Sequence, residues 1–543
     1  MKMLKDLSRY YYTMRHLKPV QILGRIWAVP KKKISAALPI NLPANLKNGL
    51  KISVPFIGHD PWNRAETIRK NEFRFLNLSK KFDNGGIDWN SPDMPLLWRF
   101  NLNYFAFLYL LNKDEQIRLC SHWIRNNPRG KTAGWHSYPL SLRITNWCKQ
   151  GIEEPDVLKS IYEQADYLYY NMEDYHPGNH LLENARALLM AAQTFKDFGA
   201  RPAAWFRKAA DILKRQLDEQ ILPDGGFFER TPMYHSLMLE LLLDIINILP
   251  EEDINYYYIR KAAGRMGVYL KSMLHPDGQI PLFNDSTLEI APSPARILRY
   301  LCMLTGSEPQ TKTSFPQSGY YIHSGEDFFI VIDAGKIGPD NLPAHSHAGI
   351  LSYELSLFSK RFIVDSGVYE YPSGEMRKFT RSTAAHNTVR IDKVDQAECW
   401  GSFRVARRYY PSGIVFRHNS EQCYFTGSFN GYSSLIGDNL IHKRQLLCDN
   451  NLRSMIVNDT VSGSGNHNAE SYIHFHPDIR LQFVDKLIIA SAGSIRIRLR
   501  IIKGSFRIED GWYCPGFGVK LRNKVLVIFE TGVPAEIEYV IDY

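Results

Sequence analysis

Several features that would assign this chain to a class at once are absent from its sequence. Its seven cysteines are odd in number and no two have the CxxC spacing, so we expect reduced thiols and no disulfide framework. No run of about 18 apolar residues occurs, and a membrane-spanning helix is therefore not predicted. No zinc finger or other motif that reads nucleic acid is present, which argues against a nucleic-acid partner.

The N-terminus also lacks the apolar core of a standard secretory signal. We therefore expect a cytoplasmic location, with the periplasm as the alternative. The first 33 residues are basic and aromatic instead. Such a charged run is usually the solvated side of a helix packed on the body of a protein, and peripheral association with a membrane surface is the alternative.

The 543 residues carry a formal charge of +10, with 44% hydrophobic and 22% charged residues. This is the composition of a globular chain that is too long for one ordinary core, so two or more domains are expected. A basic surface attracts polyanions, and with nucleic acid disfavoured these are anionic lipid and acidic polysaccharide or oligosaccharide. The sequence predicts no oligomeric state.

The first half of the chain has the pattern of one helix after another. Between residue 64 and about residue 305, apolar residues recur every three or four positions, and Pro, Gly, Asn and Asp fill the loops. Repeated antiparallel helix pairs of this length predict a toroid or solenoid. The clearest helical segments are 119–127, 138–152, 157–172, 179–199 and 203–221.

A polar stretch with two prolines breaks that pattern at 306–318, and we place a linker there. After it come short β-branched and aromatic segments of alternating polarity, which predict an antiparallel β-sandwich. The predicted fold is a multidomain α+β chain with an N-terminal (α/α) toroid and a C-terminal antiparallel β-sandwich. The predicted units are a basic segment packed on the toroid (1–60), the toroid (61–305), the linker (306–318) and the sandwich (319–543).

Asn179 and His180 follow Pro177 and Gly178 at the predicted start of a helix. Backbone N–H groups at a helix N-terminus, together with an amide and an imidazole, form a cradle for an anion. The simpler interpretation is an ordinary Asn cap with a histidine beside it.

Tyr234 lies in the first turn of a strongly apolar helix that Pro232 opens. The potential of the helix N-terminus and a nearby imidazolium would lower the pKa of its phenol from about 10 toward the working pH. A tyrosine with a lowered pKa takes up and returns a proton readily. With 30 tyrosines in the chain, a packing role is the simpler interpretation.

His345 and His347 are two positions apart at the start of an alternating apolar stretch, so we expect both on one face of a strand. Asp365 and His386 follow at short range. Two imidazoles and a carboxylate make a Zn²⁺ shell with one open position, which leaves one histidine of the pair free for chemistry. Two hydrogen-bonded sheet histidines are the alternative.

Together these residues are the parts needed for β-elimination from a uronate. That reaction removes the C5 proton, which is barely acidic while the adjacent carboxylate is charged, and breaks the C4–O bond. Asn179 and His180 would neutralise the carboxylate, and one well-aimed donor at a developing oxyanion is worth about 3 kcal/mol. Tyr234 would be acid and base on one side of the ring, with His345 as base when the two groups lie on opposite sides.

This set of motifs resembles the heparinase II/III-type polysaccharide lyases and their alginate-lyase relatives, over roughly residues 60 to 540. Those proteins have an (α/α) toroid followed by an antiparallel β-sandwich. The resemblance implies a lyase that cleaves a uronic-acid-containing polysaccharide by β-elimination. It implies that Asn179 and His180 neutralise the carboxylate, that Tyr234 is the acid and base, and that His345 is a catalytic histidine. The implied ligands of a structural Zn²⁺ are His347, Asp365 and His386.

The chain also departs from the family pattern. Many members continue as His-x-His-x-Asp, whereas Ala348 and Gly349 follow the second histidine here, which alters the hydrogen bonding expected around the metal loop. The N-terminal segment looks like the version that accompanies bacterial exopolysaccharide or capsule genes.

Further residues are candidates for lining a sugar-binding groove, because arginine pairs with carboxylate or sulfate through two hydrogen bonds and aromatic faces stack on sugar rings. Helix packing and surface ion pairs are the alternative roles for each of them. The candidates are Arg99, Asn101, Tyr104, Trp135, His136, Arg143 and Arg381.

Two other functions are kept as alternatives. A glycoside hydrolase on a toroid needs two carboxylates about 5 to 10 Å apart. A non-catalytic protein of a polysaccharide assembly system would bind an acidic glycan without cutting it. The candidate carboxylates for the hydrolase are Asp224, Glu229, Asp285 and Glu183.

Overall fold

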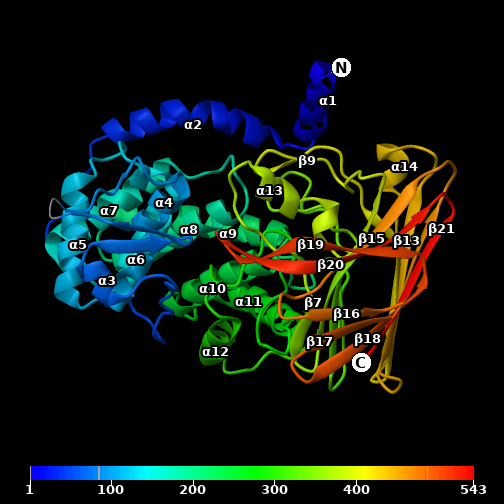
Figure 1. The fold of residues 1–543 in the computed structure, drawn as a ribbon. Coiled ribbons are helices and arrows are strands. Elements are labelled where there is room, and N and C mark those ends of the chain that lie inside the picture. The colour runs from blue at the N-terminus through cyan, green and yellow to red at the C-terminus, as the bar shows by residue number, and fades with distance from the viewer. Residues whose placement is uncertain (1, 84–85, 486) are drawn as a thin grey trace.

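The computed structural model describes residues 2–83, 86–485 and 487–543. The predicted fold class is confirmed: helices make up the N-terminal part and antiparallel sheets the C-terminal part (Figure 1). The chain begins with α1 (Lys2–Met14) and α2 (Pro19–Ala37), and α2 lies along the outer edge of the helical part. Among the described residues, none of the helices combines the length and the hydropathy needed to cross a membrane.

The toroid is held together by an apolar core that all its long helices share. Successive helices pack on one another, as α8 does on both α6 and α9, because each has apolar residues at helical spacing. Helix α10 is apolar along nearly its whole length, and almost every residue in it is buried. The helices are α3 (Ala65–Arg69), α4 (Leu96–Tyr104), η1 (Ala106–Leu110), α5 (Lys113–Asn126), η2 (Ala133–Trp135), α6 (Ser137–Lys149), α7 (Pro155–Tyr170), α8 (Asn179–Thr194), α9 (Ala200–Gln220), α10 (Pro232–Ile248), α11 (Ile254–Met273) and α12 (Pro294–Thr305). A small hairpin of β1 (Glu72–Phe75) and β2 (Leu78–Lys81), which the sequence did not predict, joins this part.

The sheets begin soon after α12 ends, and the first short strand already lies inside the predicted linker. A five-stranded sheet pairs each strand with the next one along the chain. Its strands are β3 (Ser314–Phe315), β4 (Tyr320–Ser324), β5 (Phe328–Asp333), β6 (Ser352–Leu357) and β7 (Lys360–Ile363).

Two larger sheets complete the C-terminal part. In spatial order, the eight-stranded sheet consists of β11 (Pro411–His418), β12 (Gln422–Phe429), β13 (Ile441–Asp449), β14 (Ser454–Ser462), β21 (Ala535–Asp542), β18 (Ile495–Lys503), β17 (Leu487–Ala492) and β16 (Arg480–Val484). The four-stranded sheet consists of β19 (Ser505–Gly516), β20 (Val519–Thr531), β15 (Asn468–His474) and β8 (Val389–Ile391). The connections carry α13 (Glu375–Thr380), η3 (Thr383–Ala385), β9 (Cys399–Trp400), β10 (Arg404–Val405) and α14 (Gly431–Leu435).

The five-stranded sheet joins the two parts of the molecule, because both of its faces are buried. In β5, Phe329 and Val331 pack in one cluster with Tyr269 of α11, while Ile330 and Ile332 belong to the core shared with the larger sheets. A strand buried on both faces has no polar side, so β4 and β5 are nearly continuous apolar runs. The loops at this seam between helices and sheets carry the candidate active site.

Candidate active site

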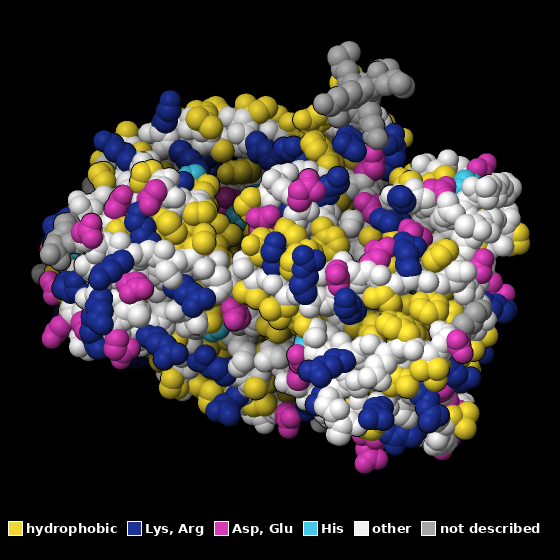
Figure 2. Space-filling model, viewed as in Figure 1, with side chains coloured by type: hydrophobic (Ala, Val, Ile, Leu, Met, Phe, Trp, Pro, Cys, Tyr) yellow, Lys and Arg dark blue, Asp and Glu magenta, His cyan; other side chains and the backbone are white. Residues whose placement is uncertain are grey.

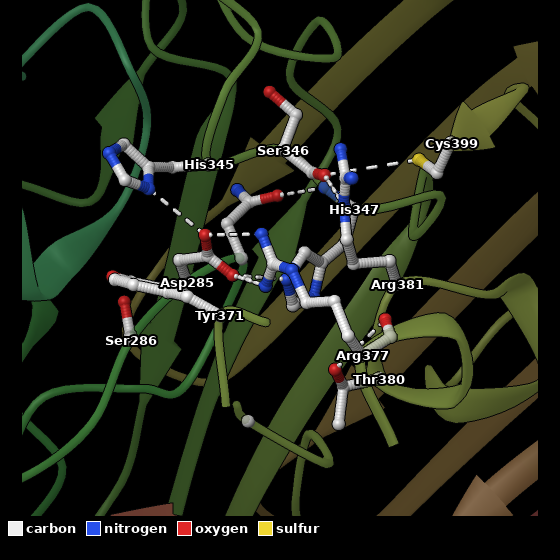
Figure 3. Close-up of polar contacts among 12 residues, drawn as sticks. Asp285, Ser286, His345, Ser346, His347, Tyr371, Arg377, Thr380, Arg381 and Cys399 are labelled. Atoms are coloured by element: carbon white, nitrogen blue, oxygen red, sulfur yellow. Dashed lines mark hydrogen bonds and ion pairs between the residues drawn. The ribbon is translucent and has the colours of Figure 1, made fainter. Parts of the chain in front are cut away.

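His345 and His347 meet at one carboxylate. Their loop runs from residue 334 to 351, between β5 and β6, so the prediction that both lie on a strand is wrong. Asp285 aligns them instead: its Oδ2 lies 2.9 Å from His345 Nδ1 and its Oδ1 lies 2.8 Å from His347 Nε2 (Figure 3). The Asn284 side chain also accepts a hydrogen bond from the backbone N–H of His347 at 3.0 Å. The spacing of the two imidazoles is therefore set by the loop between α11 and α12, which carries Asn284 and Asp285, and not by the pleat of a strand.

Asp285 is fully buried and is also paired with an arginine. Arg377, from α13, binds both carboxylate oxygens and donates from Nη2 to Oδ2 at 2.8 Å. Burial alone would raise the pKa of Asp285, but the Arg377 charge and the hydrogen bonds from His345 and His347 hold that pKa well below its usual range. Asp285 is therefore a fixed negative charge behind the two imidazoles.

The contacts with Asp285 settle which nitrogen of each imidazole carries the hydrogen. An ionised carboxylate only accepts hydrogen bonds, so His345 Nδ1 and His347 Nε2 are the donors. Burial lowers the pKa of both histidines, which keeps the rings neutral. His345 Nε2 and His347 Nδ1 therefore each present a lone pair.

Tyr234 stands directly against His345. As predicted, it lies in the first turn of α10, behind Pro232. Its ring is stacked on the His345 imidazole with 4.1 Å between centroids, and its hydroxyl lies 3.0 Å from the Tyr371 hydroxyl. The predicted direction of its pKa shift is wrong. Burial, the Tyr371 hydroxyl and the nearby carboxylates raise the pKa of Tyr234 well above its usual value, so the phenol keeps its proton.

The Asn179–His180 segment opens α8, as predicted. Gly178, just before it, has φ of 140°, and a Cβ at that position would lie 3.1 Å from Glu229 Oε1 and 2.5 Å from a Leu342 methyl carbon. Only glycine allows this close approach of the helix start to the site. His180 stacks on Tyr138 with 4.2 Å between centroids, and its Nδ1 lies 3.2 Å from Glu173.

Glu229 connects the helix start to the histidine. It is 1% exposed, and neither of its carboxyl oxygens has a hydrogen-bond partner among the described residues. Its Oε2 lies 3.6 Å from His345 Nε2, and its Oε1 lies beside Gly178. Burial, reinforced by the Asp285 charge, raises the pKa of Glu229 to about 8. At neutral pH this side chain is an uncharged acid between Asn179 and His345.

The predicted metal ligands His347, Asp365 and His386 lie close to one another. His386 Nδ1 lies 2.7 Å from Asp365 Oδ2, and the other ring nitrogen, Nε2, takes no part in this contact. Neither His386 Nε2 nor His347 Nδ1 has a hydrogen-bond partner among the described residues, and the two ring centroids are 5.3 Å apart. Within that part of the chain, no group of three or more His, Cys, Asp or Glu side chains has the arrangement of a metal site. Zinc at this place stays a prediction.

Two of the predicted substrate-binding residues are wrong, because they are structural arginines. Arg143 is buried inside the toroid, where it lies over the Trp123 ring and donates to Gln164. Arg381 is buried as well, and its donors bind backbone carbonyls, including that of Ser346. The sequence cannot distinguish such arginines from those that face a groove.

Four of the other five candidates line a cavity or pack near His180. Arg99, Trp135 and His136 line a cavity of about 370 Å³ together with Lys32 of α2. The Tyr104 ring packs edge-on against Tyr138, which stacks on His180. The Asn101 amide donates to the Leu97 carbonyl within α4. Contact of these five with a sugar stays a prediction.

Three of the four carboxylates proposed for a glycoside hydrolase are held by protein partners. Asp224 accepts from Ser318, Glu183 pairs with Arg186, and Asp285 is held by its histidines and arginine. Glu229 alone of the four has both oxygens unpartnered among the described residues.

Sequence reasoning also missed Tyr371 and Arg377, which have no local motif and reach the site only through the fold.

Two family models match the chain. The Heparinase II/III N-terminus matches residues 112–302, and the Heparinase II/III-like, C-terminal model matches residues 308–538. A heparin-sulfate lyase of Pedobacter heparinus is 24% identical over 357 residues, which cover 56% of this chain and 53% of that protein. A heparin-sulfate lyase of Bacteroides thetaiotaomicron is 23% identical over 436 residues, covering 68% and 58%. The chain spans about half the length of the curated relatives it matches.

Solved structures share the fold. A heparinase III superposes with a TM-score of 0.65 at 20% identity, over 84% of this chain and 80% of that chain. A heparan sulfate lyase from Pedobacter heparinus superposes with a TM-score of 0.61 at 18% identity, over 95% and 88%. These likenesses confirm a helical toroid followed by an antiparallel sheet domain. With both family models in sequence order, the chain belongs to the heparinase II/III family.

Proposed function

We propose that the chain is a polysaccharide lyase that cleaves a uronic-acid-containing acidic polysaccharide by β-elimination. The observation that carries the proposal is the Tyr234 ring stacked on His345 at 4.1 Å, at the seam between toroid and sheets. The start of α8 at Asn179 approaches the same place through Glu229. The related proteins named heparin-sulfate lyases make heparan sulfate the first substrate to test.

In this proposal, His345 and Tyr234 divide the proton transfers. His345 Nε2 takes the C5 proton, the C5–H electrons form the C4=C5 double bond, and the C4–O bond breaks. Tyr234 gives its phenolic proton to the departing oxygen and regains one from solvent or from His345. The division is supported by Asp285, which holds the hydrogen of His345 on Nδ1, and by the protonated state of the buried phenol.

The substrate carboxylate must be neutralised before C5 loses its proton. We propose that Asn179, His180 and protonated Glu229 provide the donors. Asn179 is buried at the first position of α8, directly after Gly178, which is the part of that helix closest to Glu229. Uncharged Glu229 donates one hydrogen bond without adding a like charge, which suits a carboxylate ligand.

We also propose that Zn²⁺ is held by His347 Nδ1 and His386 Nε2, with Asp365 orienting His386 or adding an oxygen ligand. Two buried imidazoles, each with one ring nitrogen that has no hydrogen-bond partner in the described part of the chain, fit this ion. Bound zinc would hold the loop that carries His345 in place and would not touch the sugar.

The experiment is a panel of acidic polysaccharides followed by the ultraviolet absorbance of the unsaturated uronate product. The panel contains heparan sulfate, alginate and a bacterial exopolysaccharide, and each polymer is also run with chelator. We expect absorbance to rise with at least one polymer and not with the Tyr234→Phe variant. New reducing ends without that absorbance would show a hydrolase, and binding without any cleavage would show a glycan-binding protein.

A further inference from the structure

Helix α2 turns its apolar face away from the protein. Its large hydrophobic side chains recur every three or four residues on one side of the helix, and that side faces solvent, with Ile26 70% and Trp27 64% exposed. The inward side consists of small and polar residues such as Gln21, Gly24 and Ser35. This is the reverse of an ordinary surface helix. The exposed apolar residues of α2 are Val20, Ile22, Leu23, Ile26, Trp27, Val29 and Ile34.

The inward contacts fix this orientation. Gln21 is buried and donates to the Asn341 carbonyl at 3.0 Å. Near the other end of α2, the buried Ser35 hydroxyl accepts from Asn171 at 2.7 Å. Between them, Gly24 lies so close to Tyr175 that a Cβ would come within 2.4 Å of the Tyr175 Cβ. The helix cannot roll over to bury its apolar side without losing these contacts.

The same segment carries most of the excess positive charge of the chain. Residues 1–37 contain nine Lys and Arg and one Asp, a net of +8 out of the +10 of the whole chain. Helix α2 itself has four cations and no acidic residue. Among these, Arg25 and Lys33 are exposed beside the apolar side chains. Figure 2 shows hydrophobic and basic side chains together along this edge.

We infer that α2 docks on the surface of an anionic lipid bilayer, with its apolar side chains among the acyl chains and its cations at the headgroups. A helix with an apolar face flanked by Lys and Arg is the pattern of interfacial helices. The charge also argues against the other occupants. A second copy of the chain would bring like charges together, and an acidic polysaccharide would leave the apolar side chains in water.

Docking would place the cavity of about 370 Å³ beside the membrane. Lys32, on the inner edge of α2, lines the cavity that Arg99 and His136 also line. A polymer leaving or approaching the bilayer would then meet the cavity first. This inference concerns a surface outside the catalytic groups and does not depend on the proposed lyase reaction.

The test is sedimentation of the full chain with vesicles. We expect it to sediment with vesicles of phosphatidylcholine and phosphatidylglycerol, to bind phosphatidylcholine alone at least about tenfold less, and to be released by high salt. Trp27 is the most exposed tryptophan of the described chain, so its fluorescence should shift to the blue and become shielded from acrylamide on binding. The Leu23→Ser/Ile26→Ser/Trp27→Ser variant should bind at least about tenfold more weakly.

A matched control removes exposed apolar side chains elsewhere. Ile254 and Tyr257, at the start of α11, are 88% and 71% exposed, and the Ile254→Ser/Tyr257→Ser variant should bind vesicles like the parent. Circular dichroism and cleavage of soluble polysaccharide should be the same in both variants. Arg25→Gln/Lys33→Gln should weaken binding and reduce its dependence on salt.

Three results would overturn the inference. One is no sedimentation with anionic vesicles. Another is equal binding by the triple-serine variant, which would move the contact away from α2. The third is a parent chain that forms dimers in solution and a triple-serine variant that is monomeric, with neither bound to vesicles, which would make a second copy the occupant.

Discussion

Two places in this molecule use nearly the same side chains. We call the first the site cluster and the second the sheet cluster. In each, a buried aspartate accepts from histidine and from an arginine that also lies over a tyrosine ring, 5.2 Å away in one and 5.7 Å in the other. In each, that tyrosine shares a hydrogen bond with a second tyrosine, at 3.0 Å and 2.8 Å. The site cluster is Asp285, His345, His347, Arg377, Tyr371 and Tyr234; the sheet cluster is Asp459, His442, Arg444, Tyr353 and Tyr539.

The clusters differ in what surrounds them. Asp459 is closed in by Arg444, His442 and the Ser471 hydroxyl, and it ties the eight-stranded sheet to the four-stranded one. At the site cluster, the His345 imidazole is slightly exposed and stacks on Tyr234. Beside it lies Glu229, whose carboxyl oxygens have no hydrogen-bond partner among the described residues. The same residue types therefore form a structural contact inside the core of the sheets and a candidate catalytic group where the helical and sheet parts meet.

The largest difference we expect is between two Tyr→Phe changes. Tyr234→Phe removes the proposed acid, so β-elimination should fall by about 10³-fold or more. Tyr353→Phe removes a hydroxyl from the matching pair in the sheet cluster and should cost only about 1 kcal/mol of stability. Initial rates by ultraviolet absorbance and thermal unfolding of both variants make the comparison. Equal losses of activity in the two variants would contradict the role of Tyr234.

Next come the two aspartates. Asp285→Asn and Asp459→Asn each break a buried ion pair, and each should lower the free energy of unfolding by about 3 to 5 kcal/mol. Asp285→Asn should also lower the cleavage rate about 10²-fold, because an amide can donate to His345 and reverse its protonated nitrogen. Asp459→Asn should leave the rate of the folded protein nearly unchanged. If activity follows stability alone in both, Asp285 has no positioning role.

The histidines separate metal binding from packing. His347→Ala should reduce bound zinc from about one equivalent to none, whereas His442→Ala should leave the zinc content unchanged. Metal analysis of the purified proteins gives the readout, and chelator should lower the unfolding temperature of the parent but not of His347→Ala. A parent protein without zinc, even after incubation with the metal, would overturn the zinc proposal while leaving the proposed lyase reaction standing.

Part of the fold could be read from the sequence because side-chain periodicity is local. The helical segments and strands such as β14 and β18 follow their apolar periods, and β5 is a continuous apolar run. Strand β13 lacks this pattern for a physical reason: two of its inward positions carry His442 and Arg444, so the buried side does not look apolar. The alternating apolar pattern that predicts a strand is therefore weak in β13, because the sheet cluster occupies its buried side.

The site was predictable only where a short motif marks it. Asn179 and Tyr234 lie in the first turns of helices, and Gly178 and Pro232 mark the starts of these helices in the sequence. Tyr371 and Arg377 lie in segments without a motif, and only the fold brings them to Asp285. The pKa of Tyr234 was predicted in the wrong direction because the fold buries the phenol against Tyr371 and near two carboxyl groups, and the local sequence does not show this burial.

The last comparison concerns a change of stability with pH, without a change in the reaction. The pKa of Glu229 in the folded chain is about 8, above its ordinary value. Between those two values the unfolded chain binds fewer protons than the folded one, so the folded state loses stability as pH rises through this range. Glu229→Gln removes that loss. The free energy of unfolding of Glu229→Gln, relative to that of the parent, should therefore increase by up to several kcal/mol from about pH 5 to about pH 8. Unfolding temperatures of both proteins across this range give the readout. In Asp459→Asn the offset should stay constant over this range, because its partners hold the pKa of Asp459 well below its usual value, so the carboxylate is ionised throughout. A constant offset for Glu229→Gln as well would mean that Glu229 is already charged in the folded chain, and then it could not donate to a sugar carboxylate.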